Sequence, residues 1–440
     1  MRAPLLAFFI ASCSALAARG EGPVDSALVV KAIDAGVKGL LGAQQADGSW
    51  SASDLFPPHL RIASPRPAGG REGVTAIALL ALLASDVKPD HPAIKKGFDR
   101  LFVQRAERAG RVQPGGIVGV TYDEGVVCMA LHAWSHAFAK AKNKGREPPE
   151  GRKCHLSSRA KAWLSEVAAD LAESRTTKAA WGYQTRLARA ALGEGGDTRM
   201  VTPPAGGPDR AMPGGSDNDR SNTQYAILGL RAAELCGFVV RGSLWQDVLE
   251  DFLRGQGGRG DPLQRAPEMS GGERPTTPRG WGYRAGEGAT MTMTCAGVAA
   301  VIIAREQLAF HRAFRAEDEE ATRSSIADGF AWIGQSYTHT GSSGPGQDPR
   351  NRPNRAPANE EIDGYLLYGL ERAGVLGDVV KVGQHTWYDE GAAHLLERQL
   401  RSGLWHGMHG DSVETAFALL FLKRATRPVA VELTGNAKEE

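Results

Sequence analysis

The chain has 440 residues, of which 42% are hydrophobic and 23% are charged, and this composition excludes a largely disordered protein. The 52 lysines and arginines nearly balance the 50 aspartates and glutamates. The net charge of +2 therefore predicts no dense basic surface for nucleic acid or an anionic membrane. The 54 glycines and 24 prolines exceed the usual share and indicate long loops, because both residues are poor in helix interiors. Five cysteines are too few for a disulfide scaffold.

Residues 1–17 predict a signal peptide. A positive charge at Arg2 precedes an apolar run over residues 5–10, and residues 15–17 (Ala-Leu-Ala) fit a small-residue cleavage site. Residues 10–13 also resemble a bacterial lipobox, in which Cys13 carries a lipid anchor, but simple secretion is favoured because that leader is short for a lipoprotein. We therefore expect an exported protein, periplasmic or extracellular. No other stretch of the sequence is predicted to cross a membrane, so we expect no transmembrane helix.

Taken in chain order, two kinds of helical segment alternate after the leader. The first kind has apolar residues at helical spacing with charges between them, which predicts half-exposed helices. These segments are 26–45, 92–104, 157–173, 243–256, 322–335 and 386–400. The second kind has almost no charge in its middle, which predicts helices buried on all sides. These segments are 73–84, 122–138, 222–236, 293–303, 364–373 and 412–422.

The buried segments share a pattern that marks an internal repeat. Thr75, Thr223 and Thr415 each begin a run of small and aliphatic residues, and the segments starting at Thr294 and Asp363 follow more loosely. A hairpin of one amphipathic and one buried helix buries its apolar face only against neighbouring hairpins. The sequence therefore predicts an all-α fold of about six helical hairpins in two concentric layers. Residues 18–425 are expected to form this single domain, followed by a disordered tail over residues 426–440.

Two short signatures lie in turns between the helices. Residues 44–50 (Gln-Gln-Ala-Asp-Gly-Ser-Trp) and 399–405 (Gln-Leu-Arg-Ser-Gly-Leu-Trp) both match the Gln-x3-Gly-x-Trp turn of squalene-hopene cyclases, and degenerate copies surround Trp181 and Trp281. Glycine permits the turn, while Gln and Trp cap and stack on the adjacent helix. With the repeat, these turns make the chain resemble the α/α-toroid superfamily of terpenoid cyclases and protein prenyltransferase β subunits, in its exported bacterial form. The resemblance covers residues 26–425.

The resemblance also implies a catalytic acid, and the sequence lacks it. Squalene-hopene cyclases protonate their substrate with an Asp-x-Asp-Asp-Thr motif at the start of a buried helix. The matching stretch keeps Asp219 and Thr223 but has Ser221 and Asn222 in place of the two inner carboxylates. Cyclases also need an aromatic-lined cavity, whereas aromatic residues make up only 7% of this chain. We therefore expect no hopene-type cyclisation.

The other known chemistries of the superfamily also lack their motifs. Prenyltransferases bind zinc through Asp and Cys at one buried helix start and His at another. Here Asp363 remains, but Tyr365 stands at the cysteine position and Glu414 falls near the histidine position. Complement-type thioester domains carry Gly-Cys-Gly-Glu-Gln, which is missing around Cys295. The sequence therefore predicts no metal and no cofactor.

Polar residues at the starts of the buried helices form the candidate site. On a ring they would converge on one mouth, together with the long loops 57–71, 176–217, 257–279 and 336–361. The candidate ligand-binding residues are Asp219, Asn222, Tyr225, Asp363, Tyr365, Asp411 and Glu414. Asp363 and Glu414, from adjacent hairpins, are also the candidates for a catalytic acid and base. Helix capping is the simpler explanation of the polar residues, because such side chains are favoured in first turns.

Two groups of histidines are weaker metal candidates. Glu124, Cys128, His132 and His136 recur every fourth residue, but over about 18 Å of one rigid helix they cannot meet at one ion. We interpret Cys128 as a core residue and the two histidines as favourable charges near a helix C-terminus. The histidines at 406 and 409, before the last buried helix, match no metal motif and are interpreted as loop residues.

Three functions remain open from the sequence, and it does not decide whether the protein is an enzyme. The favoured one is a ring protein that binds a small molecule, such as an isoprenoid or a glycan, or an envelope protein, at its mouth. The second is a lyase or isomerase acting on an isoprenoid or a glycan, with Asp363 and Glu414 as acid and base. The third is a structural interaction module of the cell envelope. A wide aromatic cavity favours an enzyme on lipid, and a plugged bore favours a scaffold.

Overall fold

The computed structural model is all-α over the part of the chain that it describes. This part comprises residues 24–51, 72–110, 119–148, 152–175, 179–182, 184–185, 219–257, 277–284, 286–340 and 361–426. The predicted signal peptide and most of the long loops lie outside the described residues. Of the predicted tail, only Thr426 lies inside them, and it is tied down rather than loose. Its backbone N–H and its hydroxyl donate to the carboxylate of Glu371 at 2.9 and 2.6 Å.

All twelve predicted helices are present, with shifted ends. The amphipathic helices are α2 (Ser26–Gly42), α4 (Pro92–Gly110), α6 (Ser158–Glu173), α8 (Gly242–Gly255), α10 (Glu319–Gln335) and α12 (Trp387–Arg398). The buried helices are α3 (Glu72–Ala84), α5 (Thr121–Lys142), α7 (Arg220–Leu235), α9 (Met291–Phe310), α11 (Gly364–Leu376) and α13 (Asp411–Leu422). A single 3-10 turn, η2 (Ala316–Asp318), leads into α10.

Two short strand pairs lie beside the starts of buried helices. Strand β1 (Gly119–Val120) pairs antiparallel with β2 (Gln184–Thr185) just before α5. Strand β3 (Glu361–Ile362) pairs parallel with β4 (His406–Gly407), which brings together the chain segments that enter α11 and α13. The second pair therefore fixes the starts of two neighbouring buried helices against each other.

Helix α5 ends later than the sequence predicted. This helix continues to Lys142, so His132 and His136 lie within it and not near its C-terminus. His136 instead faces the Glu147 carboxylate, with 3.0 Å between Nε2 and Oε2. Cys128 is fully buried, as expected of a core residue.

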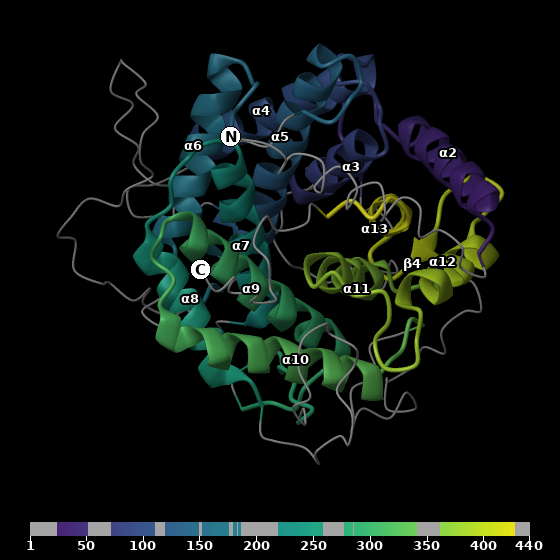
Figure 1. The fold of residues 1–440 in the computed structure, drawn as a ribbon. Helices are drawn as coiled ribbons and strands as arrows, with labels where there is room; N and C mark the ends of the chain where they lie inside the picture. Colours follow the sequence, from purple (N-terminus) through teal and green to yellow (C-terminus); the bar gives the residue numbers. More distant parts are fainter. Residues whose placement is uncertain are drawn as a thin grey trace, which may run out of the picture.

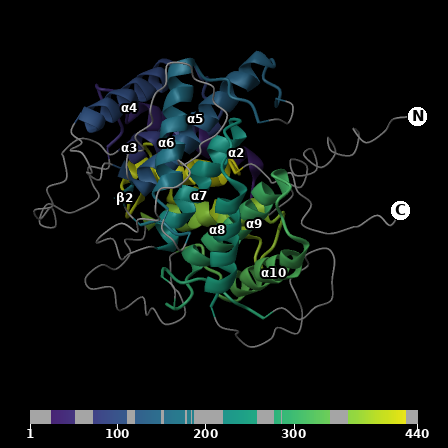
Figure 2. The same ribbon diagram turned by 90° about the vertical axis from the view of Figure 1, so that its left-hand side faces the viewer.

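The buried helices pack against one another in chain order. Helix α3 packs on α5, α5 on α7, α7 on α9, α9 on α11 and α11 on α13, and α13 packs back on α3. The amphipathic helices cover this circuit from outside: α4 contacts α3, α6 contacts α5 and α7, and α8 and α10 contact α9. Helix α12 contacts α11 and α13, while α2 packs mainly on α13. Figure 1 shows this arrangement of helices, and Figure 2 shows it turned by 90° about the vertical axis.

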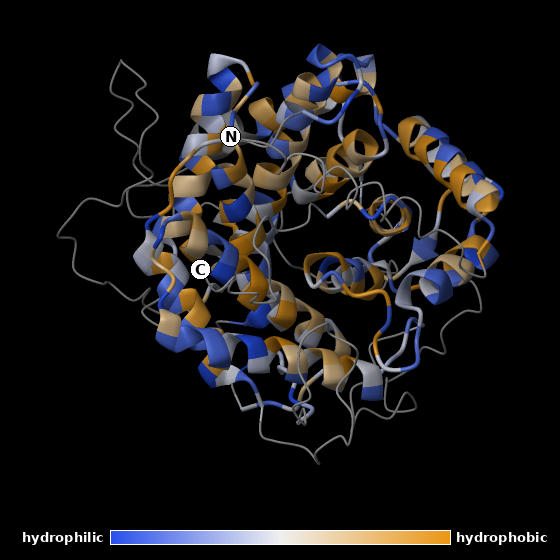
Figure 3. Ribbon diagram, viewed as in Figure 1, coloured by the Kyte–Doolittle hydropathy of each residue, from blue (hydrophilic) through white to orange (hydrophobic). Residues whose placement is uncertain are grey.

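Hydropathy explains which helices lie inside. Helices α11 and α13 are mostly orange in Figure 3, whereas α2 and α10 show alternating blue and orange. Helix α9 is long and apolar enough, by length and composition, to cross a membrane, which the sequence analysis did not anticipate. However, 89% of its apolar window is buried inside the fold, as is typical of a core helix. It is the one such helix found among the described residues.

The tryptophan turns hold the two helix types together in the same way four times. In each turn the Trp backbone N–H donates to a threonine hydroxyl at the start of a buried helix, over 2.9 to 3.2 Å. The indole N–H donates to a carbonyl near the end of the preceding amphipathic helix, over 2.6 to 2.9 Å. The four pairs are Trp50 with Thr75, Trp181 with Thr223, Trp281 with Thr294 and Trp405 with Thr415. All four indoles are fully buried.

The glutamines of the turns connect successive amphipathic helices. The Nε2 group of Gln44 donates to the carbonyl of Ala93 on α4 at 2.9 Å, and that of Gln399 donates to the carbonyl of Ala32 on α2 at 2.8 Å. Gln256, which the sequence analysis did not single out, reaches α10 in the same way through the carbonyl of Ser325, at 2.9 Å. The turn glycine is required at Gly48, where φ is +93° and a Cβ would lie 2.5 Å from a backbone oxygen.

Candidate functional site

Capping accounts for several of the predicted site residues. The Oδ1 atom of Asp219 accepts the backbone N–H of Asn222 at 2.7 Å, and its Oδ2 accepts the Asn222 side chain at 2.8 Å. Asp363 caps α11 by accepting the N–H of Leu366 at 2.9 Å. These are the contacts expected of N-cap residues, which satisfy free amides of the first helical turn.

Glu414 is fully buried and its carboxylate is occupied. Its Oε2 accepts the backbone N–H of Gly364 at 2.9 Å, which links the start of α13 to the start of α11. Its Oε1 accepts the backbone N–H of His409 at 3.0 Å and lies 2.7 Å from the Nδ1 atom of the same residue. Burial opposes protonation of His409, but the bond to Glu414 raises its pKa above the ordinary value. Glu414 therefore acts as a clamp between two hairpins.

A chain of polar side chains crosses the space between α5, α7 and α11. The hydroxyl of Tyr122 donates to the Ser221 hydroxyl, which also bonds the hydroxyl of Tyr365. The amide of Gln224 donates to the Tyr365 hydroxyl as well. Burial raises the pKa of both Tyr122 and Tyr365, so both hydroxyls remain neutral. With Arg372, these four residues are called the tyrosine–arginine network below.

Arg372 ends this network inside the protein. Arg372 is only 1% exposed, and its Nη2 atom donates a hydrogen bond to the side-chain carbonyl oxygen of Gln224 at 2.7 Å. Its guanidinium carbon lies 4.2 Å from the ring centre of Tyr368. Burial lowers the pKa of Arg372, but the neighbouring tyrosines outweigh this and keep it above the ordinary value. The Nη1 atom is buried without a hydrogen-bond partner.

Arg372 forms no ion pair among the described residues. The carboxylate of the preceding Glu371 feels its charge but is hydrogen-bonded to Thr426 instead. By contrast, buried Arg231 on α7 forms a two-pronged ion pair with Glu306 on α9, at 2.7 and 3.2 Å. Buried charges are normally paired, since desolvating a lone ion is costly. Arg372 is therefore the exceptional cation of the described core.

A narrow, partly open crevice lies beside this cation, between faces of α7 and α9. Its walls are almost entirely aliphatic, apart from one amide and the guanidinium. The lining residues are Gln224, Ile227, Leu228, Ala296, Ala299, Ala300, Ile303 and Arg372. Side chains from α5, α7 and α11 meet in the space between these helices.

The remaining predicted residues take different places. Tyr225 is 2% exposed and lies behind the network, with its ring centre 4.9 Å from that of Tyr122 and 6.3 Å from that of Tyr365. It supports the network and does not face an open mouth. Asp411 pairs with His406 over 2.6 Å at the edge of the fold. Of the predicted residues, Tyr365 is therefore a member of the network, Asp219 and Asn222 flank its Ser221 at the start of α7, and Asp411 lies apart.

His409, one of the two histidines before α13 that were predicted to be loop residues, lies beside the network. His409 is half-buried, and its ring lies 6.0 Å from Tyr365 and 6.2 Å from Phe417. Within the described ranges, no three His, Cys, Asp or Glu side chains gather closely enough to hold a metal ion. His409 belongs to the wall beside the network.

Sequence reasoning missed Arg372, Gln224, Tyr122 and Ser221 as ligand-contacting candidates. One signal was available: Arg372 and the preceding Glu371 are the two charged residues of a segment that was predicted to be buried. A charged residue inside a buried helix requires a partner or a function. The contact that creates the network, between Ser221 and Tyr365, joins residues 144 positions apart and has no local signal.

Comparison with known proteins identifies no relative. No family model matches the chain, and no curated protein matches it significantly. The chemistry of the site is therefore argued from its own residues, and the family resemblance of the tryptophan turns remains a hypothesis.

Proposed function

We propose that this protein is an exported α/α toroid that binds a small amphipathic anion inside its ring. The circular packing order of the buried helices and the four equivalent tryptophan turns support the toroid and its resemblance to terpenoid cyclases and prenyltransferase β subunits. The export signal at residues 1–17 supports a periplasmic or extracellular location. The replaced residues Ser221 and Asn222 argue against cyclase activity.

The observation that carries the binding proposal is the unpaired guanidinium of Arg372. A buried cation without a carboxylate is destabilising, and an incoming anion removes that cost. The free Nη1 atom supplies a donor for such a ligand. A carboxylate or a phosphate fits a guanidinium best, because two oxygens match its parallel N–H groups.

The aliphatic crevice gives the rest of the ligand its character. A hydrocarbon chain suits walls of isoleucine, leucine and alanine, whereas a glycan would need polar partners that these walls lack. An isoprenoid or fatty acyl chain with an acidic head is therefore favoured over a glycan. The half-buried Tyr365 is hydrogen-bonded to Gln224, which itself lines the crevice, so the network and the crevice are continuous.

The enzyme alternative is weakened by the geometry of Glu414. All the donors around this carboxylate are backbone N–H groups of the protein or belong to the His409 ring. The carboxylate is therefore already hydrogen-bonded within the protein and does not face a substrate as a base. Asp363 is engaged as a cap. A binding role needs neither residue to change its protonation state.

Matched probes test the proposal. Palmitate and farnesyl phosphate are compared with hexadecanol and farnesol by thermal shift and calorimetry on the purified mature protein. We expect the acids to raise the Tm by several degrees and the alcohols to have a much smaller effect, because only the acids pair with Arg372. Arg372→Gln should abolish the difference between acid and alcohol.

Arg424→Gln is the matched control. Arg424 stands nine residues after Thr415, as Arg372 stands nine after Asp363, but it stacks on Tyr388 at 3.6 Å and is partly exposed. This variant should keep the preference for acids. Equal response to acids and alcohols, or no binding of any probe and no small molecule in native mass spectra, would favour a structural module of the envelope.

A further inference from the structure

Two cysteines come together at the end of α7 that lies away from the tyrosine–arginine network. Cys236 is the C-cap residue of α7, and Cys154 lies in the segment that leads into α6. The Cys154 thiol is hydrogen-bonded to Cys236, although the residues are far apart in the sequence. Both thiols also share the hydroxyl of Ser135 on α5.

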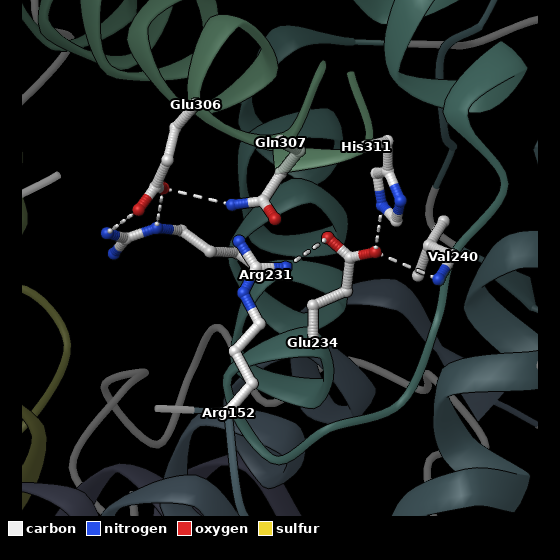
Figure 4. A network of polar contacts seen from close by, with 7 residues as sticks. All are labelled: Arg152, Arg231, Glu234, Val240, Glu306, Gln307 and His311. Atoms are coloured by element: carbon white, nitrogen blue, oxygen red, sulfur yellow. Dashed lines mark hydrogen bonds and ion pairs between the residues drawn. The ribbon is translucent and has the colours of Figure 1, made fainter. Parts of the chain in front are cut away.

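The backbones on either side of the two thiols are held against each other. Arg152 reaches Glu234, with 3.3 Å between Nη1 and Oε2 (Figure 4). A Cβ on Gly237 would lie 2.9 Å from the carbonyl oxygen of Arg152, so the two segments are in direct contact. The next residue, His155, donates its backbone N–H to Ser135 at 2.8 Å. Each cysteine is thus flanked by residues that touch the partner's segment or the shared serine.

The polar network of Figure 4 anchors the α7 side of this contact. Glu234 is fully buried, and its Oε1 accepts the backbone N–H of Val240 at 2.9 Å and lies 2.7 Å from the Nε2 atom of His311. On the same helix, Arg231 pairs with Glu306, which also accepts from Gln307 at 2.9 Å. The C-terminal turn of α7 is therefore fixed where it meets residues 152–155.

We propose that Cys154 and Cys236 form a redox-active pair that closes to an intramolecular disulfide on exposure to an oxidised disulfide. This inference does not depend on the ligand-binding proposal. The half-buried Cys154 is the accessible partner, and the buried Cys236 is the resolving partner. Thiol chemistry agrees with this order, because the hydrogen bond from Cys236 lowers the pKa of Cys154 to about 6 and the same contact raises that of Cys236.

The reaction is a thiol–disulfide exchange in two steps. The Cys154 thiolate attacks one sulfur of glutathione disulfide, forms a mixed disulfide and releases one glutathione thiolate, which takes up the proton lost by Cys154. The Cys236 thiol then loses its proton, attacks the Cys154 sulfur and releases the second glutathione. The protein loses two hydrogens and two electrons, and one glutathione disulfide becomes two glutathiones.

The other two cysteines of the described chain provide an internal contrast. Cys128 and Cys295 are both fully buried, and burial raises the pKa of Cys295 to about 12. A buried neutral thiol reacts slowly with disulfides. Both should remain reduced under conditions that oxidise the proposed pair.

The test uses the purified chain in oxidised or reduced glutathione, followed by denaturing alkylation and tryptic mapping. We expect one peptide that contains Cys154 joined to one that contains Cys236 and a mass lower by about 2 Da than that of the reduced chain. Cleavage after Lys153, Arg159, Arg231 and Arg241 isolates both peptides from the remaining cysteines. Full alkylation of Cys154 and Cys236 after oxidation, or a bridge from either residue to Cys128, would overturn the proposal.

A stability readout supports the mapping. The bridge closes a loop of about 80 residues, so reduction should lower the Tm by several degrees. Cys154→Ser should abolish this dependence, and because Cys154 is half-buried the variant is expected to fold. Cys295→Ala is the matched control and should keep it. A Tm that responds equally to reduction in wild type and Cys154→Ser would contradict the assignment.

Discussion

The tryptophan turns and the tyrosine–arginine network are both built from the first turns of buried helices, yet they differ in repetition. The Trp-to-threonine bond occurs four times with the same donor and acceptor atoms. The contacts of Gln224 with Tyr365 and Arg372 occur once. In a protein made of repeats, a contact that recurs at equivalent positions serves the architecture. A contact made only once, particularly one that leaves a buried charge unpaired, indicates a specific task.

The largest effect is expected in the turns. Trp281→Ala should lower the free energy of unfolding by about 3–5 kcal/mol, because it removes a fully buried indole and leaves a cavity. Gly297 and Gly329 have no side chains to fill that space and pack directly on the ring. Urea titrations monitored by circular dichroism give this value. A loss below about 1 kcal/mol would show that the turns are not the main support of the fold.

A pair of arginine substitutions tests whether the network is kept for function. Arg231→Met should cost about 3–5 kcal/mol, because it leaves the carboxylate of Glu306 buried and unpaired. Arg372→Met should leave stability within about 1 kcal/mol of wild type or increase it, because it removes a buried cation that forms no ion pair with a described residue. The measurement is again the urea midpoint, in protein freed of bound lipid. Equal losses in both variants would mean that Arg372 stabilises the fold.

The contributions of His394 and His409 to the free energy of unfolding should change with pH in opposite directions. Burial lowers the pKa of His394, on the outer helix α12, to about 4, so its contribution is complete above pH 6.5 and is lost as the pH falls toward 4. This loss is on the order of 2–3 kcal/mol. The pKa of His409, beside the network, is raised by Glu414, so its contribution is complete below 6.5 and is lost as the pH rises through its folded pKa.

Stability curves of His394→Phe and His409→Phe between pH 4 and 8 separate these contributions. The first variant should flatten the acid side of the profile, and the second should flatten the side near neutrality. Unchanged slopes in both variants would assign the pH dependence to other groups.

The smallest effect concerns the threonines of the turns. Thr415→Val should cost about 1 kcal/mol, since it removes the acceptor for the backbone N–H of Trp405 but keeps the side-chain volume. Thr75→Val should cost a similar amount if the turns are equivalent. Thermal unfolding of the two variants checks this, and a difference of more than about 2 kcal/mol would argue against equivalence.

Much of the fold was predictable because the spacing of hydrophobic residues along a helix shows which of its faces are buried. The alternation of amphipathic and apolar segments predicted each helix and its layer, and the Gln-x3-Gly-x-Trp turns predicted that Trp50 and Trp405 would support adjacent helices. The candidate site was less predictable. Spacing shows which face of a helix a residue occupies but not which distant residue it contacts. It therefore predicted Tyr365 and Glu414 as site residues but not their hydrogen bonds to Ser221 and to the backbone of Gly364.

The bond from Gln399 to the carbonyl of Ala32 has a consequence for biosynthesis. It joins the first and the last amphipathic helix of the described chain by the same kind of hydrogen bond, from a glutamine amide to a backbone carbonyl, that Gln44 forms with Ala93. Helix α2 packs mainly on α13, so the first of the described helices to be synthesised has to wait for the last of them before it is covered. At about 5–20 residues per second, the 367 residues between the two partners take on the order of 20–70 s to synthesise. During this interval the face of α2 that packs on α13 has no partner to cover it.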